Sequence, residues 1–125
     1  MLNKINLIEY FEKGIKSDTE LKIGTEHEKF ILNKSTLKPL SYDEKNGIRD
    51  IFSSLIELGW KPIYEGKNNS IVGLMNDQQN ISLEPAGQFE LSGQILENIH
   101  QTCDEITNHL NQMKQLSLKH NFIML

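Results

Sequence analysis

Four short apolar segments separated by tight turns occupy the middle of this chain and constrain its fold more than any other feature. The segments cover residues 60–64, 70–75, 80–83 and 88–91. The connections are Gly-Lys-Asn-Asn at 66–69 and Asn-Asp-Gln-Gln at 76–79, and Pro85-Ala86-Gly87 precedes the fourth segment. Strands joined by such short turns pair antiparallel, because a parallel crossover needs about a dozen residues or more. We therefore predict an antiparallel sheet at the centre of the fold.

Three further segments have the three- and four-residue apolar spacing of amphipathic helices. They cover residues 2–16, a segment opened by a capping box of Ser41 and Glu44 and closed by Gly59, and residues 95–119. In the last of these helices the apolar positions are predicted to form one buried stripe, made of Leu96, Ile99, Cys103, Ile106, Leu110 and Met113.

Two more strands complete the prediction, at residues 21–32 and in the apolar tail 122–125. The expected order is α-β-α-β-β-β-β-α-β, in a single domain over residues 1–125. This order predicts an α+β fold with a mainly antiparallel sheet and helices on one face. Because a chain ending on four apolar residues looks unfinished, we expect exposed apolar surface around residues 122–125 and self-association.

Charge and composition exclude several classes of protein. The 125 residues include 13 Lys and Arg against 17 Asp and Glu, so the formal net charge is −4 and no basic block favours nucleic acid. The single cysteine, Cys103, forms no internal disulfide, and no Cys/His spacing indicates zinc. No apolar stretch is long enough for a signal peptide or a membrane span. We predict a soluble, cytoplasmic protein with neither a nucleic-acid nor a membrane partner.

Two stretches carry carboxylates where a strand is expected. In a strand, Glu26 and Glu28 lie on the same face, roughly 6–7 Å apart. Glu84 and Glu90 flank the Pro/Gly bend, with Ser82 and Gln88 on their faces. If the two stretches lie side by side, four carboxylates share one sheet surface, where like charges destabilise each other unless water or a cation compensates. Hard divalent cations select such oxygen ligands, and Mg²⁺ adds the phosphates of a nucleotide.

Two interpretations of these carboxylates remain open: a metal site made of Glu26, Glu28, Glu84 and Glu90, or an ordinary solvated face. Other candidates are weaker. His27 points to the face opposite Glu26, and His100 and His109 are nine residues apart, so these two lie on nearly opposite sides of a helix. The segment 66–70 lacks the second glycine and the Gly-Lys-Ser/Thr ending of a phosphate loop, which favours a hairpin turn.

The same two stretches resemble the glutamate–cysteine ligases (γ-glutamylcysteine synthetases) of the plant and proteobacterial type. The matching residues are 23–30, Ile-Gly-Thr-Glu-His-Glu-Lys-Phe, and 81–93, Ile-Ser-Leu-Glu-Pro-Ala-Gly-Gln-Phe-Glu-Leu-Ser-Gly. Leu96-Glu97 and residues 99–103 extend the match, as do Glu65-Gly66 and residues 71–74. The resemblance covers nearly the whole chain, but only the N-terminal portion of the family's catalytic domain.

This resemblance implies a glutamine-synthetase-like fold and an ATP-dependent ligase of glutathione biosynthesis. ATP phosphorylates the γ-carboxylate of glutamate and the amine of cysteine attacks the acyl phosphate, with Mg²⁺ held by glutamates that match Glu26, Glu28, Glu84 and Glu90 here. Two departures stand out. Ile31 replaces a glycine of the family, and Ala86 replaces the first glycine of Pro-Gly-Gly, a mild change unless that position needs a positive φ.

Length is the larger departure, because the family's further nucleotide- and substrate-binding residues lie beyond Leu125. We therefore expect a fragment that is inactive alone: a decayed gene product, or one half of an enzyme completed by a second polypeptide. Two alternatives stay open. One is a non-catalytic remnant or interaction module that docks on another chain through its apolar tail and last helix. The other is a stand-alone acidic metal-binding domain.

Overall fold

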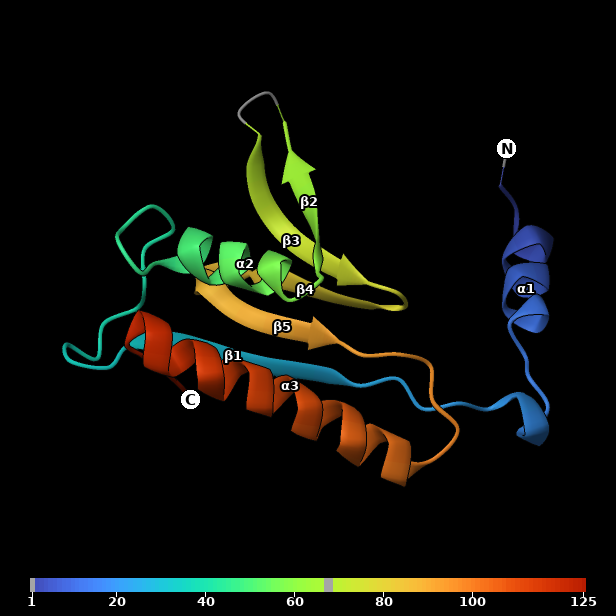
Figure 1. Ribbon diagram of the computed structural model, residues 1–125. Helices are drawn as coiled ribbons and strands as arrows, with labels where there is room; N and C mark the ends of the chain where they lie inside the picture. Colours follow the sequence, from blue (N-terminus) through green and yellow to red (C-terminus); the bar gives the residue numbers. More distant parts are fainter. Residues whose placement is uncertain (1, 67–68) are drawn as a thin grey trace.

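The computed structural model describes residues 2–66 and 69–125 and contains one six-stranded sheet (Figure 1). Two short 3₁₀ turns, η1 (Asp18–Glu20) and η2 (Pro85–Gly87), precede β1 and β5. The helices and strands are α1 (Lys4–Lys13), β1 (Glu26–Asn33), α2 (Ile48–Glu57), β2 (Lys61–Glu65), β3 (Ser70–Asn76), β4 (Gln79–Glu84), β5 (Gln88–Ser92), α3 (Ile99–His120) and β6 (Phe122–Met124). This is the order predicted from the sequence.

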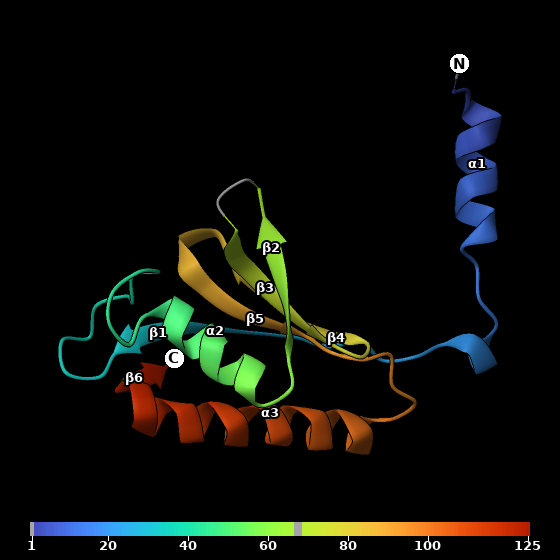
Figure 2. The same ribbon diagram turned by 45° about the horizontal axis from the view of Figure 1, so that its top comes forward.

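The strands lie in the order β2-β3-β4-β5-β1-β6, and every neighbouring pair is antiparallel. Strands β2 to β5 follow one another in the chain. The predicted turn at 76–79 joins β3 to β4, and the predicted turn at 66–69 lies partly outside the described residues. Both α2 and α3 lie on the same side of the sheet (Figures 1 and 2). The prediction of an α+β fold with helices on one face of an antiparallel sheet is confirmed.

The hydrophobic core fills the space between this face and the two helices. Helix α2 supplies Ile51, Phe52 and Leu55, all fully buried, because its apolar residues recur every three or four positions. The sheet supplies alternate residues of its strands, such as Ile81 on β4 and Phe89 on β5. The rings of Phe52 and Phe89 meet at 5.7 Å between their centroids. Gly59, with φ of 102°, follows the end of α2 as predicted.

Helix α1 stands apart from this core (Figure 1). The helix is shorter than the predicted segment 2–16, because Asn3 and Asn6 make a reciprocal capping box at its start and Gly14 closes its last turn. None of its residues is buried, and its apolar side chains, including Ile5 and Phe11, are exposed. The helix therefore contributes little to the stability of the domain. No helix in the described part of the chain is long and apolar enough to cross a membrane.

The predicted start of the second helix is wrong. The Glu44 carboxylate does accept a hydrogen bond from the backbone N–H of Ser41, at 2.6 Å, as in a capping box. That contact closes a turn instead of a helix, and α2 begins only at Ile48, after Gly47. The backbone N–H of Ile48 donates to the carbonyl of Ser41, which joins the end of this turn to its beginning.

The predicted buried stripe of the last helix is also wrong in most positions. Met113 is buried, but Cys103 is exposed, and Ile99 and Leu110 are 58% and 41% exposed. The residues of α3 that face the sheet are Thr102, Glu105, His109, Met113, Leu116 and His120. Several of these polar side chains are buried because they find partners inside, such as His120, whose Nε2 lies 2.8 Å from the Ser54 hydroxyl. The apolar stripe therefore lies on the flank of α3.

The tail forms the strand expected of it. Phe122 pairs with Asn33 and is 1% exposed, so the expectation of exposed apolar surface is wrong there, whereas Leu125 is 64% exposed. Strand β6 covers only the C-terminal half of β1, from Ile31 to Asn33, and residues 30 and 125 extend the pairing by two backbone hydrogen bonds. Among the described residues, no strand pairs with residues 26–29 on this side of β1.

Candidate metal site on the open face of the sheet

The alternation of β1 decides which of its charged residues face away from the helices. Ile31 is 3% exposed and belongs to the core, and His27, four residues earlier on the same face, is half-buried. Glu26 and Glu28 lie on the opposite, exposed face. Ile31, which occupies the position of a glycine in the family it resembles, therefore projects into the core, and its bulk does not crowd the carboxylates.

The register of the neighbouring strands brings the second pair of carboxylates to the same face. Glu28 on β1 lies directly opposite Glu90 on β5, and Glu90 in turn lies opposite Ser82 on β4. Glu84, two residues after Ser82, shares its face and lies opposite Gln88. All four candidate residues therefore project from the open face of three adjacent strands, with Glu28 and Glu90 at the centre.

Neutral donors hold three of these carboxylates. Gln88 donates from Nε2 to Oε2 of Glu28 at 2.8 Å, and Ser92 donates to Oε1 of Glu90 at 2.8 Å. Ser82 donates to Oε1 of Glu84 at 3.2 Å. Like charges directly opposite on two strands destabilise a sheet, and the ion pairs found among the described residues do not involve these glutamates. The open face is therefore a concentration of negative charge without a cationic partner in that part of the chain.

The four side chains do not form a closed cage. Within residues 2–66 and 69–125, no group of three or more His, Cys, Asp or Glu side chains is gathered closely enough to hold a metal ion. What the sheet offers is a row of oxygen donors: carboxylates, serine hydroxyls and the amide of Gln88. The metal-binding role of Glu26, Glu28, Glu84 and Glu90 stays a prediction.

The turn between β4 and β5 sets the positions of Glu84 and Gln88. Ala86 has φ of 66° and ψ of 13°, and Gly87 has φ of 77°. These are left-handed conformations, which cost an alanine about 1–2 kcal/mol and a glycine almost nothing. Ala86 is thus a strained residue, and replacement of a family glycine at this position is not a mild change.

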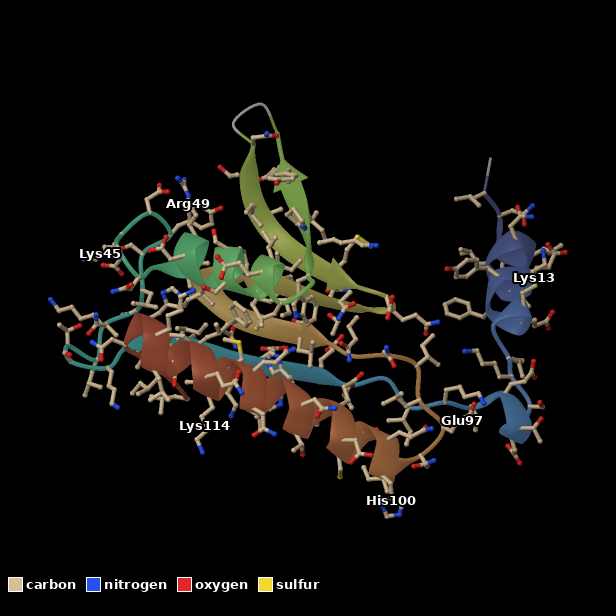
Figure 3. The ribbon with its side chains drawn as sticks, in the orientation of Figure 1. Lys13, Lys45, Arg49, Glu97, His100 and Lys114 are labelled. Atoms are coloured by element: carbon tan, nitrogen blue, oxygen red, sulfur yellow. The ribbon has the colours of Figure 1, made fainter. Side chains whose placement is uncertain are left out.

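The histidines lie on the other side of the sheet. The rings of His27 and His109 meet edge to face at 5.9 Å between their centroids. Burial, and then the charge of His27, lower the pKa of His109 to about 4, against a smaller opposite effect of Glu105. His100 is at the exposed start of α3 and points away from the sheet (Figure 3). These positions confirm that His27 packs inside and that His100 and His109 do not face one another.

Glu105 is the residue that the sequence interpretation missed. It lies on the buried face of α3 and is 8% exposed. Its carboxylate accepts from the Thr25 hydroxyl at 3.0 Å, the Gln79 amide at 2.8 Å and the backbone N–H of Gln94 at 2.8 Å. The signal available was the series of polar residues at helical spacing beside the apolar stripe, beginning with Glu105, Asn108 and Gln112.

The fold and this site define an α+β domain whose sheet has one face under helices and one open, acidic face. Residues 22–121 match Glutamate-cysteine ligase family 2. The chain belongs to this family.

Curated relatives support the same family. The chain is 48% identical over 114 residues to glutamate–cysteine ligase A, chloroplastic, of Oryza sativa subsp. japonica. This match covers 90% of this chain and 22% of that protein. It is 45% identical over 117 residues to the chloroplastic glutamate–cysteine ligase of Brassica juncea and 44% over 120 residues to that of Arabidopsis thaliana, each covering 93% of this chain and 22% of the relative. The chain thus spans about a fifth of the length of these relatives.

Proposed function

We propose that this chain forms the N-terminal part of an ATP- and Mg²⁺-dependent glutamate–cysteine ligase, which joins glutamate to cysteine in the first step of glutathione biosynthesis. One observation carries the proposal beyond family membership: the four matching glutamates project from one face of three adjacent strands, with Glu28 opposite Glu90. Their chemistry fits Mg²⁺, which prefers oxygen donors and needs only one or two carboxylates when a nucleotide supplies phosphates.

In this proposal Glu28 and Glu90 hold the central ion, with Glu26 and Glu84 at either side. When bound, Mg²⁺ neutralises the negative charge of the phosphates and of the transferred phosphoryl group. The protein itself orients the ligands. Gln88 and Ser92 hold the carboxylates of Glu28 and Glu90 by hydrogen bonds of 2.8 Å each, and the backbone of the sheet fixes the distance between the two strands.

We further propose that the isolated chain lacks ligase activity and that a second polypeptide completes the domain. The chain matches about a fifth of the length of the relatives, so most of their sequence has no counterpart in this chain. The small-molecule substrates of the completed enzyme would be ATP, glutamate and cysteine. The cytoplasmic location expected from the sequence stays a prediction, and the plant relatives are named as chloroplastic proteins.

Calorimetric titration of the chain with MgCl₂, with and without a non-hydrolysable ATP analogue, tests the metal site. The single variants Glu28→Gln and Glu90→Gln are expected to weaken Mg²⁺ binding in the presence of the analogue about tenfold or more. Glu12→Gln on α1 is the matched control, because it removes the same charge from an exposed position outside the sheet. Equal Mg²⁺ affinity in all four proteins contradicts the assignment. Measurable γ-glutamylcysteine formation by the 125-residue chain alone contradicts the proposed incompleteness.

A second candidate function has its own observation. The apolar residues of α1 and the flank of α3 are exposed, which favours a module that docks on another chain without catalysing a reaction. A coupled ATPase assay with glutamate and cysteine, with and without the polypeptide that completes the family's sequence, separates the two functions. Activity in the mixture supports the ligase, and a complex without activity supports the docking module. Strong Mg²⁺ binding with the same affinity in the presence and absence of the ATP analogue instead supports a stand-alone metal-binding domain.

A further inference from the structure

A polar cavity of about 440 Å³ lies on the helix-covered side of the sheet, away from the four glutamates. Leu91 lines it, and because neighbouring strand residues point to opposite faces, Glu90 projects from the other side. Trp60, Glu105 and His109 also line the cavity. Its remaining walls include six carboxamide side chains: Asn76, Gln79, Asn108, Asn111, Gln112 and Gln115. The cavity has the size of a small-molecule site and an unusually polar lining.

Glu105 is the one charged side chain on the wall of this cavity, as far as the described residues show. It is 8% exposed, and the donors that it accepts from are neutral: a hydroxyl, an amide and a backbone N–H. Within the described part of the chain, it forms no ion pair. A carboxylate buried without a cation loses hydration that neutral hydrogen bonds only partly replace. The electrostatic complement of this cavity is a positive charge.

Two buried aromatic residues support a ligand with hydrogen-bonding groups. Trp60 and His109 are each 4% exposed, and neither the indole N–H nor either imidazole nitrogen has a partner among the described residues. Because burial lowers the pKa of His109 to about 4, its ring is neutral at neutral pH and adds no positive charge to the wall. The carboxamides each add an oxygen acceptor. The unprotonated ring nitrogen of His109 and the carboxamide oxygens can accept from an N–H-bearing cation, whereas the indole N–H of Trp60 can only donate and needs an acceptor elsewhere on the ligand or in water.

We propose that this cavity binds a small ligand bearing an ammonium group, with the Glu105 carboxylate as its counter-ion and carboxamide oxygens as acceptors for its remaining N–H groups. A charge-assisted hydrogen bond to Glu105 is stronger than those that its neutral partners make, and the ring of Trp60 offers an aromatic surface that a cation favours. The ammonium group comes either from a free amine or from a lysine side chain of another protein. This proposal does not depend on the proposed ligase function.

Trp60 makes the test direct, because it is the only tryptophan of the chain. Its fluorescence is followed during titration of the full chain with butylammonium, 1-butanol or butyrate, at constant ionic strength and pH 7.5. These probes share a four-carbon chain and differ in charge. Butylammonium is expected to give a saturable change with a Kd of about 1–10 mM, a range typical of so small a ligand. The other two should bind at least about tenfold more weakly. No saturation with butylammonium, or equal binding of butyrate, overturns the proposal.

Variants of the wall test the role of charge. Glu105→Gln should weaken butylammonium binding at least about tenfold, and Glu12→Gln, which removes the same charge from α1, should leave it unchanged. Because Glu105 also holds three neighbouring groups, its variant is checked for folding by circular dichroism. If Glu105→Gln does not fold, Gln112→Glu and Gln112→Lys still test the proposal, because they change the charge of the cavity wall at a half-buried position. The first should tighten binding about threefold or more, and the second should weaken it. Unchanged affinity in both overturns the proposal.

The two sources of the ammonium group are distinguished by a further pair of probes. Nα-acetyl-lysine methylamide carries the lysine side chain with peptide groups at its base, and its norleucine analogue lacks the charge. Tighter binding of the lysine derivative than of butylammonium assigns the site to a protein side chain, and tighter binding of butylammonium assigns it to a free amine. Equal binding of the norleucine analogue and the lysine derivative counts against a cation site.

Discussion

Buried His109 on α3 predicts a loss of stability in mild acid. His109 has a pKa of about 4 in the folded chain, because burial disfavours its charged form, whereas the ordinary value is 6.5. The unfolded chain therefore binds more protons than the folded chain between these two values. The stability that His109 contributes is fully present above pH 6.5 and falls as the pH is lowered toward 4; below pH 4 the contribution of this residue no longer changes.

The size of the effect follows from this difference. One pKa unit corresponds to about 1.4 kcal/mol, so His109 alone removes about 3 kcal/mol of unfolding free energy by pH 4, and about 2 kcal/mol by pH 5. His27 and His120 add to the loss, because burial lowers their pKa values as well. A domain with a typical total of about 5–15 kcal/mol would be measurably weakened.

Urea unfolding at a series of pH values from 7.5 to 5, followed by circular dichroism, measures this dependence. His109→Leu should remove about 2 kcal/mol of the loss between these limits, because leucine does not titrate. At pH 7.5 the variant should be about as stable as the parent chain, since neither ring nitrogen of His109 has a partner among the described residues. His100→Gln, at an exposed position, is the control and should keep the full pH dependence. An unchanged pH dependence in His109→Leu would refute the reasoning.

Substitutions at Ala86, Gly87 and Gly93 give the remaining predictions, each measured as a change in urea unfolding free energy. Ala86→Gly should stabilise the chain by about 0.5–1 kcal/mol, because relief of the left-handed strain exceeds the entropy that glycine adds to the unfolded chain. Gly87→Ala should destabilise the chain for the same reason. If Ala86→Gly is destabilising, the turn is not strained. Gly93→Ala should destabilise by about 2–3 kcal/mol, because its Cβ would overlap the carboxylate of Glu105 and the hydroxyl of Thr25. Gly24→Ala, with open space around it, is the matched control, and equal effects of the two substitutions would contradict this explanation.

The sequence predicted the sheet well because its determinants are local. Tight turns, such as the two-residue connection between Asn76 and Gln79, force neighbouring strands to pair antiparallel. The face on which Glu26 and Glu28 lie also follows from strand alternation alone. The register that sets Glu28 opposite Glu90 could not be predicted locally. It depends on how β1 and β5 pair across more than fifty residues of intervening chain.

The rotation of α3 was mispredicted for a different reason. Hydrophobic periodicity assigns the apolar stripe of Ile99, Cys103 and Leu110 to the core, since burial normally favours apolar residues. The folded chain instead buries Glu105 and His120, which have partners on other elements, Thr25 and Ser54 among them. Such partners are distant in sequence and leave no local pattern. The same limitation hid the polar cavity beside α3.

The half-covered edge of β1 gives its charges a second consequence. An uncovered strand edge presents backbone groups that an incoming chain can extend into a larger sheet, the first step toward fibrous aggregates, and proteins commonly guard such edges with charged side chains. Glu26, Glu28 and Lys29 stand along this edge. By this rule, the glutamates proposed to bind divalent ions also hinder the pairing of another strand with this edge. An ion that neutralises their charge would remove part of that protection while it is bound.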